Sequence, residues 1–233
     1  MAYLGGIVLF LAVALGASAN DAPPAFVAVY QLSQGSLAFG TMERRFELKA
    51  DGNYRYLSRM KTSGVLALVR SDKITESSTG KFRDGQFVPT TYSYHNSRGD
   101  KQFALRFDYR NGQVMRSDQA NGWSAAMPAR TLDKLVYQMQ MMIDLTSEPA
   151  ALQYSIADKN KFKDYQFDNR GPEEVETDAG RYQTLRLERG AEGAERRTVV
   201  WCARKLDWLP VKVEYREKDG SVTTALLRSF TQP

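Results

Sequence analysis

Residues 209–216 read Leu-Pro-Val-Lys-Val-Glu-Tyr-Arg, and this stretch indicates the fold most directly. From Val211 onward, apolar or aromatic side chains alternate with charged ones. Because successive side chains of a β-strand point to opposite faces of a sheet, the alternation predicts an antiparallel strand with one buried face and one face in water. The expected buried face consists of Val211, Val213 and Tyr215, and the expected solvent face of Lys212, Glu214 and Arg216.

The same alternation recurs earlier in the chain, and turn-forming pairs separate such stretches. Asp-Gly and Asn-Gly tolerate the positive φ that tight hairpins require. The alternating apolar residues are Tyr54 and Tyr56 in one stretch, and Phe103, Leu105 and Phe107 in another. The turn signals are Asp51-Gly52, Asp84-Gly85, Asn111-Gly112, Asn121-Gly122, Asp178-Ala-Gly180 and Asp219-Gly220. The sequence therefore predicts a mainly β fold in which about eight to eleven antiparallel strands curl into a half-open barrel.

Residues 131–145, TLDKLVYQMQMMIDL, break this pattern. Their apolar residues recur at steps of three and four, which predicts one amphipathic helix over about 131–145. Thr131 is the expected cap, Asp133 favours the positive end of the helix dipole, and Pro149 follows the expected end. The helix lies between a β-rich half over about 26–118 and another over about 152–230, and we expect it to cover the concave face of the sheet.

The N-terminal residues 1–19 contain no charged side chain, and the apolar run from Leu4 to Leu15 precedes the small-x-small pattern Ala17-Ser-Ala19. This arrangement is typical of a secretory signal peptide, and we expect cleavage after Ala19. An uncleaved anchor is the alternative, although the run is short for a membrane span. Residues 20–233 are then a single β-rich domain, expected to be soluble in an oxidising compartment outside the cytoplasm.

Composition excludes several classes of function. The chain of 233 residues has one histidine and one cysteine, which excludes a Cys/His zinc site and a disulfide framework. We expect no metal and no other cofactor. The net charge of +5 is spread along the chain, which argues against nucleic-acid binding and predicts a solvated surface, with transient contact to anionic membranes as the alternative.

Few residues suggest catalysis. His95 could titrate near neutrality, but its neighbours form no recognisable nucleophile motif, so a strand or turn position is the main interpretation. Cys202 lies in a β-branched run and is expected to be buried, with an intermolecular disulfide as the alternative. We therefore do not expect an enzyme.

A larger set of apolar and aromatic side chains admits two interpretations. The set either packs as core or lines an apolar cavity between sheet and helix, because small barrels occur in both states. Methionine side chains adapt their shape to varied apolar partners, and this property is useful in an apolar cavity that binds a ligand. The candidate ligand-lining residues are Tyr54, Tyr56, Phe103, Leu105, Phe107, Met139, Met142, Trp201, Val211, Val213 and Tyr215.

Several short motifs, in order and at their spacing, resemble DUF3108, a family of exported bacterial proteins of unknown function. They are Tyr30 and Gly40, Asp84-Gly85-x-x-x-Pro89-x-x-Tyr92, Phe107-Asp108, Asp133, Trp201-Cys-Ala203, Leu209-Pro-Val-Lys-Val-Glu214, Asp219-Gly220 and Leu227. The resemblance covers most of the chain after residue 19. It implies a location in the periplasm and a half-open barrel similar to that of lipoprotein carriers such as LolA. It implies no catalytic residues.

Three functions are compatible with these observations. The first is a non-catalytic periplasmic binding protein for an apolar or lipid-like ligand, in envelope lipid or lipoprotein handling. The second is an envelope assembly protein that docks a secretion or surface-appendage component, whose strand would add to an exposed sheet edge. The third is a hydrolase that uses His95.

Overall fold

The computed structural model describes residues 22–63, 73–116, 122–190 and 195–233. They form one 15-stranded sheet whose strand order is β8-β7-β6-β5-β4-β3-β2-β1-β15-β14-β13-β12-β11-β10-β9. The order ends at β8 and β9, which do not pair with each other in this part of the chain, so the barrel is half-open as predicted. The predicted signal peptide, residues 1–19, lies outside the described residues.

The sheet consists of two consecutive meanders. The N-terminal meander contains β1 (Phe26–Gln34), β2 (Leu37–Leu48), β3 (Asn53–Thr62), β4 (Lys73–Arg83), β5 (Gln86–Asn96), β6 (Lys101–Asp108), β7 (Gln113–Arg116) and β8 (Ser124–Ala126). The C-terminal meander contains β9 (Leu132–Asp133), β10 (Ala151–Asp158), β11 (Lys161–Thr177), β12 (Gly180–Arg189), β13 (Arg197–Ala203), β14 (Leu209–Arg216) and β15 (Val222–Thr231). The fifteen strands exceed the expected eight to eleven, in part because β7, β8 and β9 have only four, three and two residues and are too short to show alternation.

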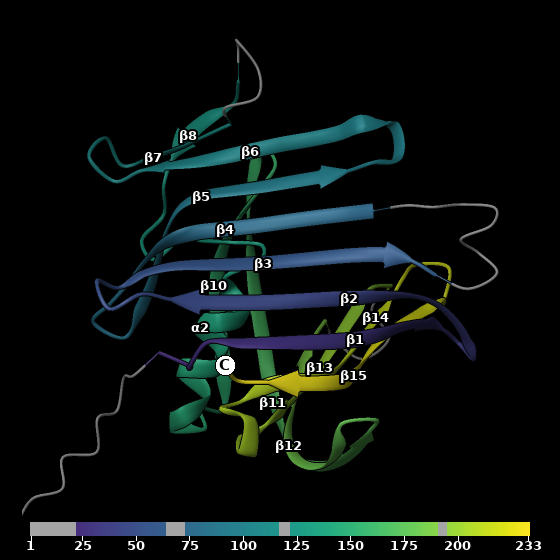
Figure 1. Cartoon of the computed structure of the whole chain (residues 1–233). Coiled ribbons are helices and arrows are strands. Elements are labelled where there is room, and N and C mark those ends of the chain that lie inside the picture. Colours follow the sequence, from purple (N-terminus) through teal and green to yellow (C-terminus); the bar gives the residue numbers. More distant parts are fainter. Residues whose placement is uncertain (1–21, 64–72, 117–121, 191–194) are drawn as a thin grey trace, which may run out of the picture.

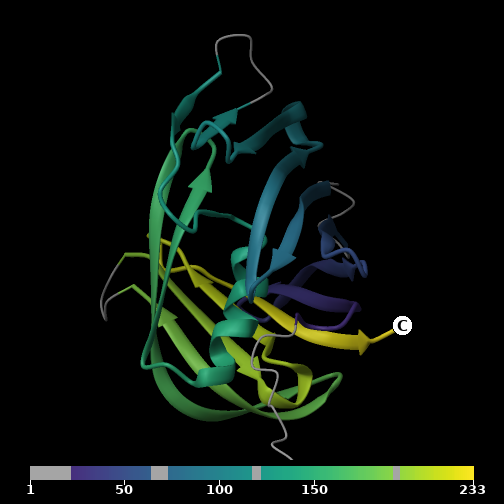
Figure 2. The same ribbon diagram turned by 90° about the vertical axis from the view of Figure 1, so that its left-hand side faces the viewer.

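The two meanders meet along two lines that differ in bonding. At the closed seam, β1 and β15 pair antiparallel, with Val27 opposite Thr231 and Gln34 opposite Thr223. At the open seam, β8 lies across from β9 and β10, and residues 127–131 cross from one meander to the other. Figures 1 and 2 show that the meanders face each other and that helix α2 (Tyr137–Asp144) lies between them. Among the described residues, the two meanders are therefore joined by strand pairing only between β1 and β15.

The predicted alternation is confirmed in β3 and at Val211 and Val213 of β14, whereas Tyr215, predicted on the buried face of β14, is exposed near the end of that strand. Tyr54 and Tyr56 of β3 are buried while Arg55 between them is exposed. The Asp-Gly signal also acts as predicted, since Asp84 and Gly85 have φ of 51° and 71° in the turn from β4 to β5. Such positive φ values are those that tight two-residue hairpins require. The Asn121 turn signal lies outside the described residues.

The helix is shorter than predicted. It begins at Tyr137 instead of Thr131, because Leu132 and Asp133 form β9 in parallel with β10. The side chain of Asp133 then accepts hydrogen bonds from the backbone N–H groups of Leu135 and Val136, both at 2.8 Å. The hydroxyl of Thr131 instead donates to the carbonyl oxygen of Pro128 at 2.7 Å. Asp133, and not Thr131, therefore caps the turn that leads into the helix.

The polar residues of α2 are buried as well as its apolar ones. Gln138 accepts a hydrogen bond from the buried guanidinium of Arg44 on β2. Gln140 accepts one from the backbone N–H of Phe87 at 2.9 Å and donates to the carbonyl oxygen of Gly85 at 3.2 Å. Because buried amides need such partners, the two glutamines fix the helix to the N-terminal meander. The face of the helix that was expected to contact solvent therefore contacts the N-terminal meander instead.

Candidate functional site

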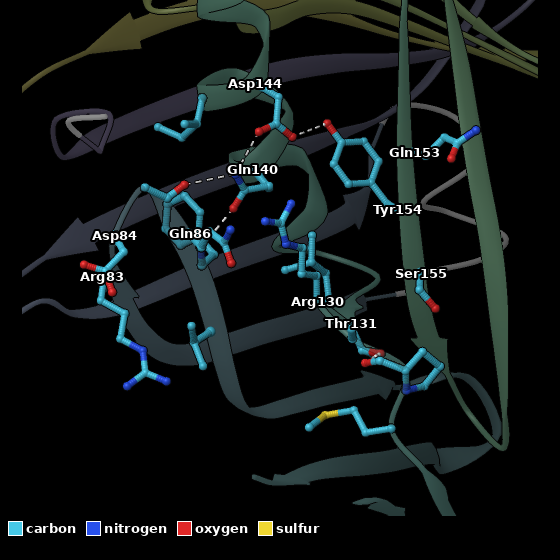
Figure 3. A pocket seen from close by; sticks show the side chains of 18 of the residues that line it. Arg83, Asp84, Gln86, Arg130, Thr131, Gln140, Asp144, Gln153, Tyr154 and Ser155 are labelled. Atoms are coloured by element: carbon cyan, nitrogen blue, oxygen red, sulfur yellow. Dashed lines mark hydrogen bonds between the residues drawn. The ribbon is translucent and has the colours of Figure 1, made fainter. Parts of the chain in front are cut away.

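A cleft of about 1130 Å³ opens at the open seam. Its walls come from the β4–β5 turn, the crossing segment 127–131, the C-terminal half of α2 and the outer edge of β10. Figure 3 shows these four segments around the hollow. They are distant in sequence, and the cleft exists because the sheet does not close between β8 and β10.

One wall of the cleft is apolar. Tyr109 stands partly exposed at this wall, and its hydroxyl donates to the carbonyl oxygen of Pro89 at 2.9 Å. Its ring therefore presents an apolar surface while its polar atom is satisfied. The apolar lining consists of Phe87, Val88, Tyr109, Met127, Leu132 and Ile143.

The opposite side is polar and is organised around Asp144 at the end of α2. Its Oδ1 accepts a hydrogen bond from Gln140 Nε2 and its Oδ2 accepts one from the Tyr154 hydroxyl, both at 3.0 Å (Figure 3). Burial raises the pKa of the Asp144 carboxyl above its usual value, and the two hydrogen bonds act in the opposite direction. Burial also raises the pKa of Tyr154. Chemically, this side holds one carboxyl group whose oxygens are both engaged.

Two arginines line the cleft. Arg83 ends β4, and Arg130 lies in the crossing segment with a left-handed backbone φ of 56°. Both side chains are exposed. Figure 3 shows Arg130 between Gln86 and Tyr154, whereas the guanidinium of Arg83 is directed away from it. The arrangement combines apolar surface with a cation at the mouth, which suits a ligand that is itself part apolar and part charged.

The residues predicted to line a ligand site lie elsewhere. Ten of them are buried in the core, and Tyr215 is 36% exposed. Val213 and Tyr215 lie beside a second hollow of about 10 Å³ between α2 and β14, which is about the space that one water molecule needs. The large cleft is lined by other residues, so the ten buried residues belong to its supporting core and Tyr215 lies outside that core. Contact with a ligand stays a prediction for all eleven. They are Tyr54, Tyr56, Phe103, Leu105, Phe107, Met139, Met142, Trp201, Val211, Val213 and Tyr215.

The two residues considered for reactivity occupy different environments. His95 lies exposed on β5. Cys202 is fully buried on β13, as predicted, and burial raises the pKa of its thiol. A thiol in such surroundings is less nucleophilic than an exposed one. Neither residue lines the cleft.

Sequence reasoning missed the cleft residues because their segments come together only in the folded sheet. One signal was present: Gln138 and Gln140 interrupt an apolar helix, and amides at such positions require specific partners. Gln140 connects the helix to both Phe87 and Asp144, and so marks the position of the cleft.

The described residues contain no cluster of three or more His, Cys, Asp or Glu side chains with the placement of a metal site. Their helices are all too short or too polar to cross a membrane.

Comparison with known proteins shows the fold and the family. A crystal structure of a β-barrel-like protein of the domain of unknown function DUF1849, from Brucella abortus, is similar with a TM-score of 0.59 at 9% identity. The match covers 90% of this chain and 98% of that one. The other solved structures are a protein provisionally described as a lipoprotein from Parabacteroides distasonis and one described as an exported protein with a YmcC-like fold from Bacteroides fragilis. Each has a TM-score of 0.41, at 9% and 8% identity respectively, and each match covers 91% of this chain and 98% of the other.

No curated protein matches the sequence. The family model described as "Protein of unknown function (DUF3108)" matches residues 29–227, which span the sheet from β1 to β15. The predicted resemblance is therefore confirmed, and the chain belongs to the DUF3108 family.

Proposed function

We propose that this chain is a non-catalytic binding protein that holds an apolar or lipid-like ligand in the cleft at the open seam. The observation that carries the proposal is the cleft of about 1130 Å³ with an apolar wall. Ligand sites in proteins are typically concave, mostly apolar and about 300–1,000 Å³ in volume, with a few placed polar groups. This cleft has the size and the mixed lining of such a site.

The apolar wall can account for the affinity. Transfer of each methylene group from water to an apolar environment contributes about 0.8 kcal/mol. An acyl chain laid along Phe87, Val88 and Ile143 would gain this contribution repeatedly, while Gln140, Asp144 and Tyr154 fix the shape of the facing side. Since those three polar groups already bond to one another, burying a chain beside them leaves little polar surface unsatisfied.

A periplasmic location is part of the proposal. It rests on the uncharged N-terminal segment 1–19 and its small-x-small site at Ala17-Ser-Ala19. A carrier or sensor of lipid-like molecules would work there between membranes, in envelope lipid or lipoprotein handling.

A second candidate function is the docking of an envelope protein, and the outer edge of β10 favours it. The carbonyl oxygen of Ala150 accepts from the N–H of Asn169, so alternation in the antiparallel ladder turns the backbone groups of Gln153 away from β11. On that side β9 pairs with Ile156 and Ala157 only, among the residues that the structure describes. The backbone of Gln153 is therefore available to an added strand.

Native mass spectrometry of the protein purified from the periplasm, followed by organic extraction, tests the first proposal. We expect a co-purified lipid and displacement of a fluorescent fatty acid by that lipid. The variant Ala129→Trp adds a large ring to the crossing segment that lines the cleft and should abolish binding. Gln166→Trp, on the exposed face of β11, is the matched control and should bind normally. A protein without extractable lipid that binds no probe, but crosslinks to one partner through β10, would instead support the docking function.

A further inference from the structure

We propose that the cleft selects amphiphiles with an anionic head, a carboxylate or a phosphate, and that Arg130 binds this head while the apolar chain lies along the opposite wall. The inference rests on the proposed binding function and adds the chemical class of the ligand. It follows from three observations. The Arg130 guanidinium has no hydrogen-bond partner among the described residues, its backbone is in the left-handed conformation, and the guanidinium of Arg83 is directed away from it.

Arg130 is the cation that lies within the cleft. Figure 3 places its side chain between Gln86 and Tyr154. In the part of the chain that the structure describes, its guanidinium makes no hydrogen bond and no ion pair. A guanidinium offers five N–H donors in a planar fork that matches a carboxylate or a phosphate. Arg130 is therefore prepared for an anionic partner without first having to break a contact within the protein.

The backbone holds Arg130 in place. Its φ of 56° lies in the left-handed region, which a residue with a side chain adopts at a cost in free energy. The flanking bonds maintain this conformation: the Thr131 hydroxyl donates to Pro128, and the N–H of Met127 donates to the carbonyl oxygen of Gly112 at 2.8 Å. The crossing segment is thus tied to the N-terminal meander on one side and continues into β9 on the other. Strain that is kept in this way is common where a side chain must face a ligand.

Asp144 attracts Arg130 electrostatically, but neither Asp144 nor Asp84 forms a hydrogen bond or an ion pair with its guanidinium among the described residues. Both oxygens of Asp144 accept hydrogen bonds, from Gln140 and from Tyr154. Asp84 lies exposed in the turn after β4, beside Arg83. The N–H donors of Arg130 consequently remain for a ligand, although Asp144 offsets part of its positive charge.

Arg83 provides a matched control. It lines the same cleft and carries the same charge, but its guanidinium is directed away from Arg130 (Figure 3). Arg83→Gln and Arg130→Gln change the net charge equally. A general electrostatic attraction would respond to both substitutions, whereas a specific head-group contact responds to Arg130→Gln alone.

The test uses the chain without its predicted signal segment and two fluorescent probes, cis-parinaric acid and its uncharged methyl ester, at pH 7.5 and 0.15 M salt. We expect the wild type to bind the acid about tenfold more tightly than the ester, since a hydrogen-bonded charge pair contributes about this much. Arg130→Gln should remove the tenfold preference and leave ester binding unchanged. Arg130→Lys should retain part of the preference, and Arg83→Gln should change it less than twofold.

Competition separates the two sources of an anionic head. Oleate and a lysophosphatidic acid are each used to displace the acid probe, and the stronger competitor identifies carboxylate or phosphate as the preferred head. Equal binding of acid and ester by the wild type, or an equal loss in Arg83→Gln and Arg130→Gln, would overturn the inference while leaving the proposed function intact. Binding of neither probe would overturn the proposed function itself. Melting curves verify that the variants fold, as expected for exposed positions.

Discussion

The two seams of the sheet join the same two meanders in opposite ways. At the closed seam, eight residue pairs of β1 and β15 form an antiparallel ladder with one register shift between Val29 and Tyr30. At the open seam, β8 has three residues and β9 has two, and the rings of Trp123 and Phe162, with centroids 5.5 Å apart, contact each other across the gap. Backbone hydrogen bonds hold the first seam, whereas side chains and one crossing segment span the second.

The closed seam holds the two meanders together, whereas the open seam carries the proposed binding site. Beside the closed seam, large side chains such as Tyr30 and Phe26 fill the interior completely. Beside the open seam, the interior opens into the cleft. Short edge strands and a covering segment are common ways to protect an unpaired edge, and here they leave the edge of β10 accessible at Gln153. Substitutions at the two seams should therefore differ in the property that they damage.

The largest effect is expected where the two meanders enclose the helix. Met139 of α2 is 0% exposed and lies outside the lining of the cleft. Met139→Asp buries a carboxylate without a prepared partner, and we expect a loss of about 4 kcal/mol or more, enough to prevent folding. Met139→Leu should cost less than about 1.5 kcal/mol. Circular dichroism during thermal unfolding measures both. Retention of the melting temperature in Met139→Asp, together with lost ligand binding, would show that Met139 faces a cavity.

The closed seam itself is tested at Leu227. This residue of β15 is fully buried and lies opposite Tyr30 of β1. Leu227→Ala should lower the free energy of unfolding by about 2–5 kcal/mol, because a cavity remains where the side chain packed. Leu226→Ala, on the less buried face of the same strand, should cost less. Urea unfolding monitored by fluorescence gives both values, and probe binding by the folded fraction should persist in each variant. An equal cost for the two substitutions would contradict the assignment of faces.

The stability of the fold should depend on pH through the buried carboxyl group of Asp133 in β9, at the open seam. Burial raises its carboxyl pKa from 3.8 to about 6, and the hydrogen bonds from Ser78, Val136 and Leu135 act in the opposite direction. Because the folded state holds the proton more tightly, this group stabilises the fold fully below about pH 4, and the stabilisation is lost as the pH rises through 6. A difference of about two pKa units corresponds to about 3 kcal/mol.

Asp133→Asn isolates this contribution, since an amide oxygen can still accept from Leu135 and Val136 but does not titrate in this range. The difference in unfolding free energy between the wild type and Asp133→Asn, measured in urea from pH 4 to pH 7, should change by up to about 3 kcal/mol. A difference that is constant with pH would show that Asp133 titrates as an ordinary exposed carboxyl group.

The smallest effect is expected where side chains alone span the gap. Trp123 is half-buried against Phe162. Trp123→Ala should cost about 1 kcal/mol, the order of an aromatic pair contact, and Trp123→Phe should restore most of it. Here the informative readout is the dissociation rate of the fatty-acid probe, which we expect to rise because the crossing segment loses a nearby contact. A loss of stability as large as that of Leu227→Ala would mean that the two seams are equivalent.

The sequence was sufficient for the sheet and insufficient for the cleft. Period-two alternation at Tyr54 and Tyr56 and the Asp-Gly turn at Asp84 depend on local backbone geometry, and they were predicted correctly. The start of the helix was predicted six residues too early, because Leu132 and Asp133 share the apolar spacing of a helix yet pair with β10. Tertiary pairing overrode the local pattern.

The candidate site could not be predicted for a different reason. A buried core residue and a ligand-lining residue are both apolar and both occur on the inward face of a strand, so Tyr56 and Phe87 look alike in sequence. Only the position of the missing strand pairing distinguishes them. That position depends on where β8 and β9 lie and end. These strands have only three and two residues, which is too short to show an alternating pattern in the sequence.

The pairing of β1 with β15 has one more consequence. Val27 lies opposite Thr231, so the first and last described strands bring the two ends of the domain side by side. The described chain therefore begins and ends in two neighbouring, paired strands in the middle of the sheet. A short linker between the ends and a new break at the Asp219-Gly220 turn should give a circular permutant with the same fold. Because β15 follows every other described strand in the sequence, its ladder with β1 can form only after those strands have been synthesised.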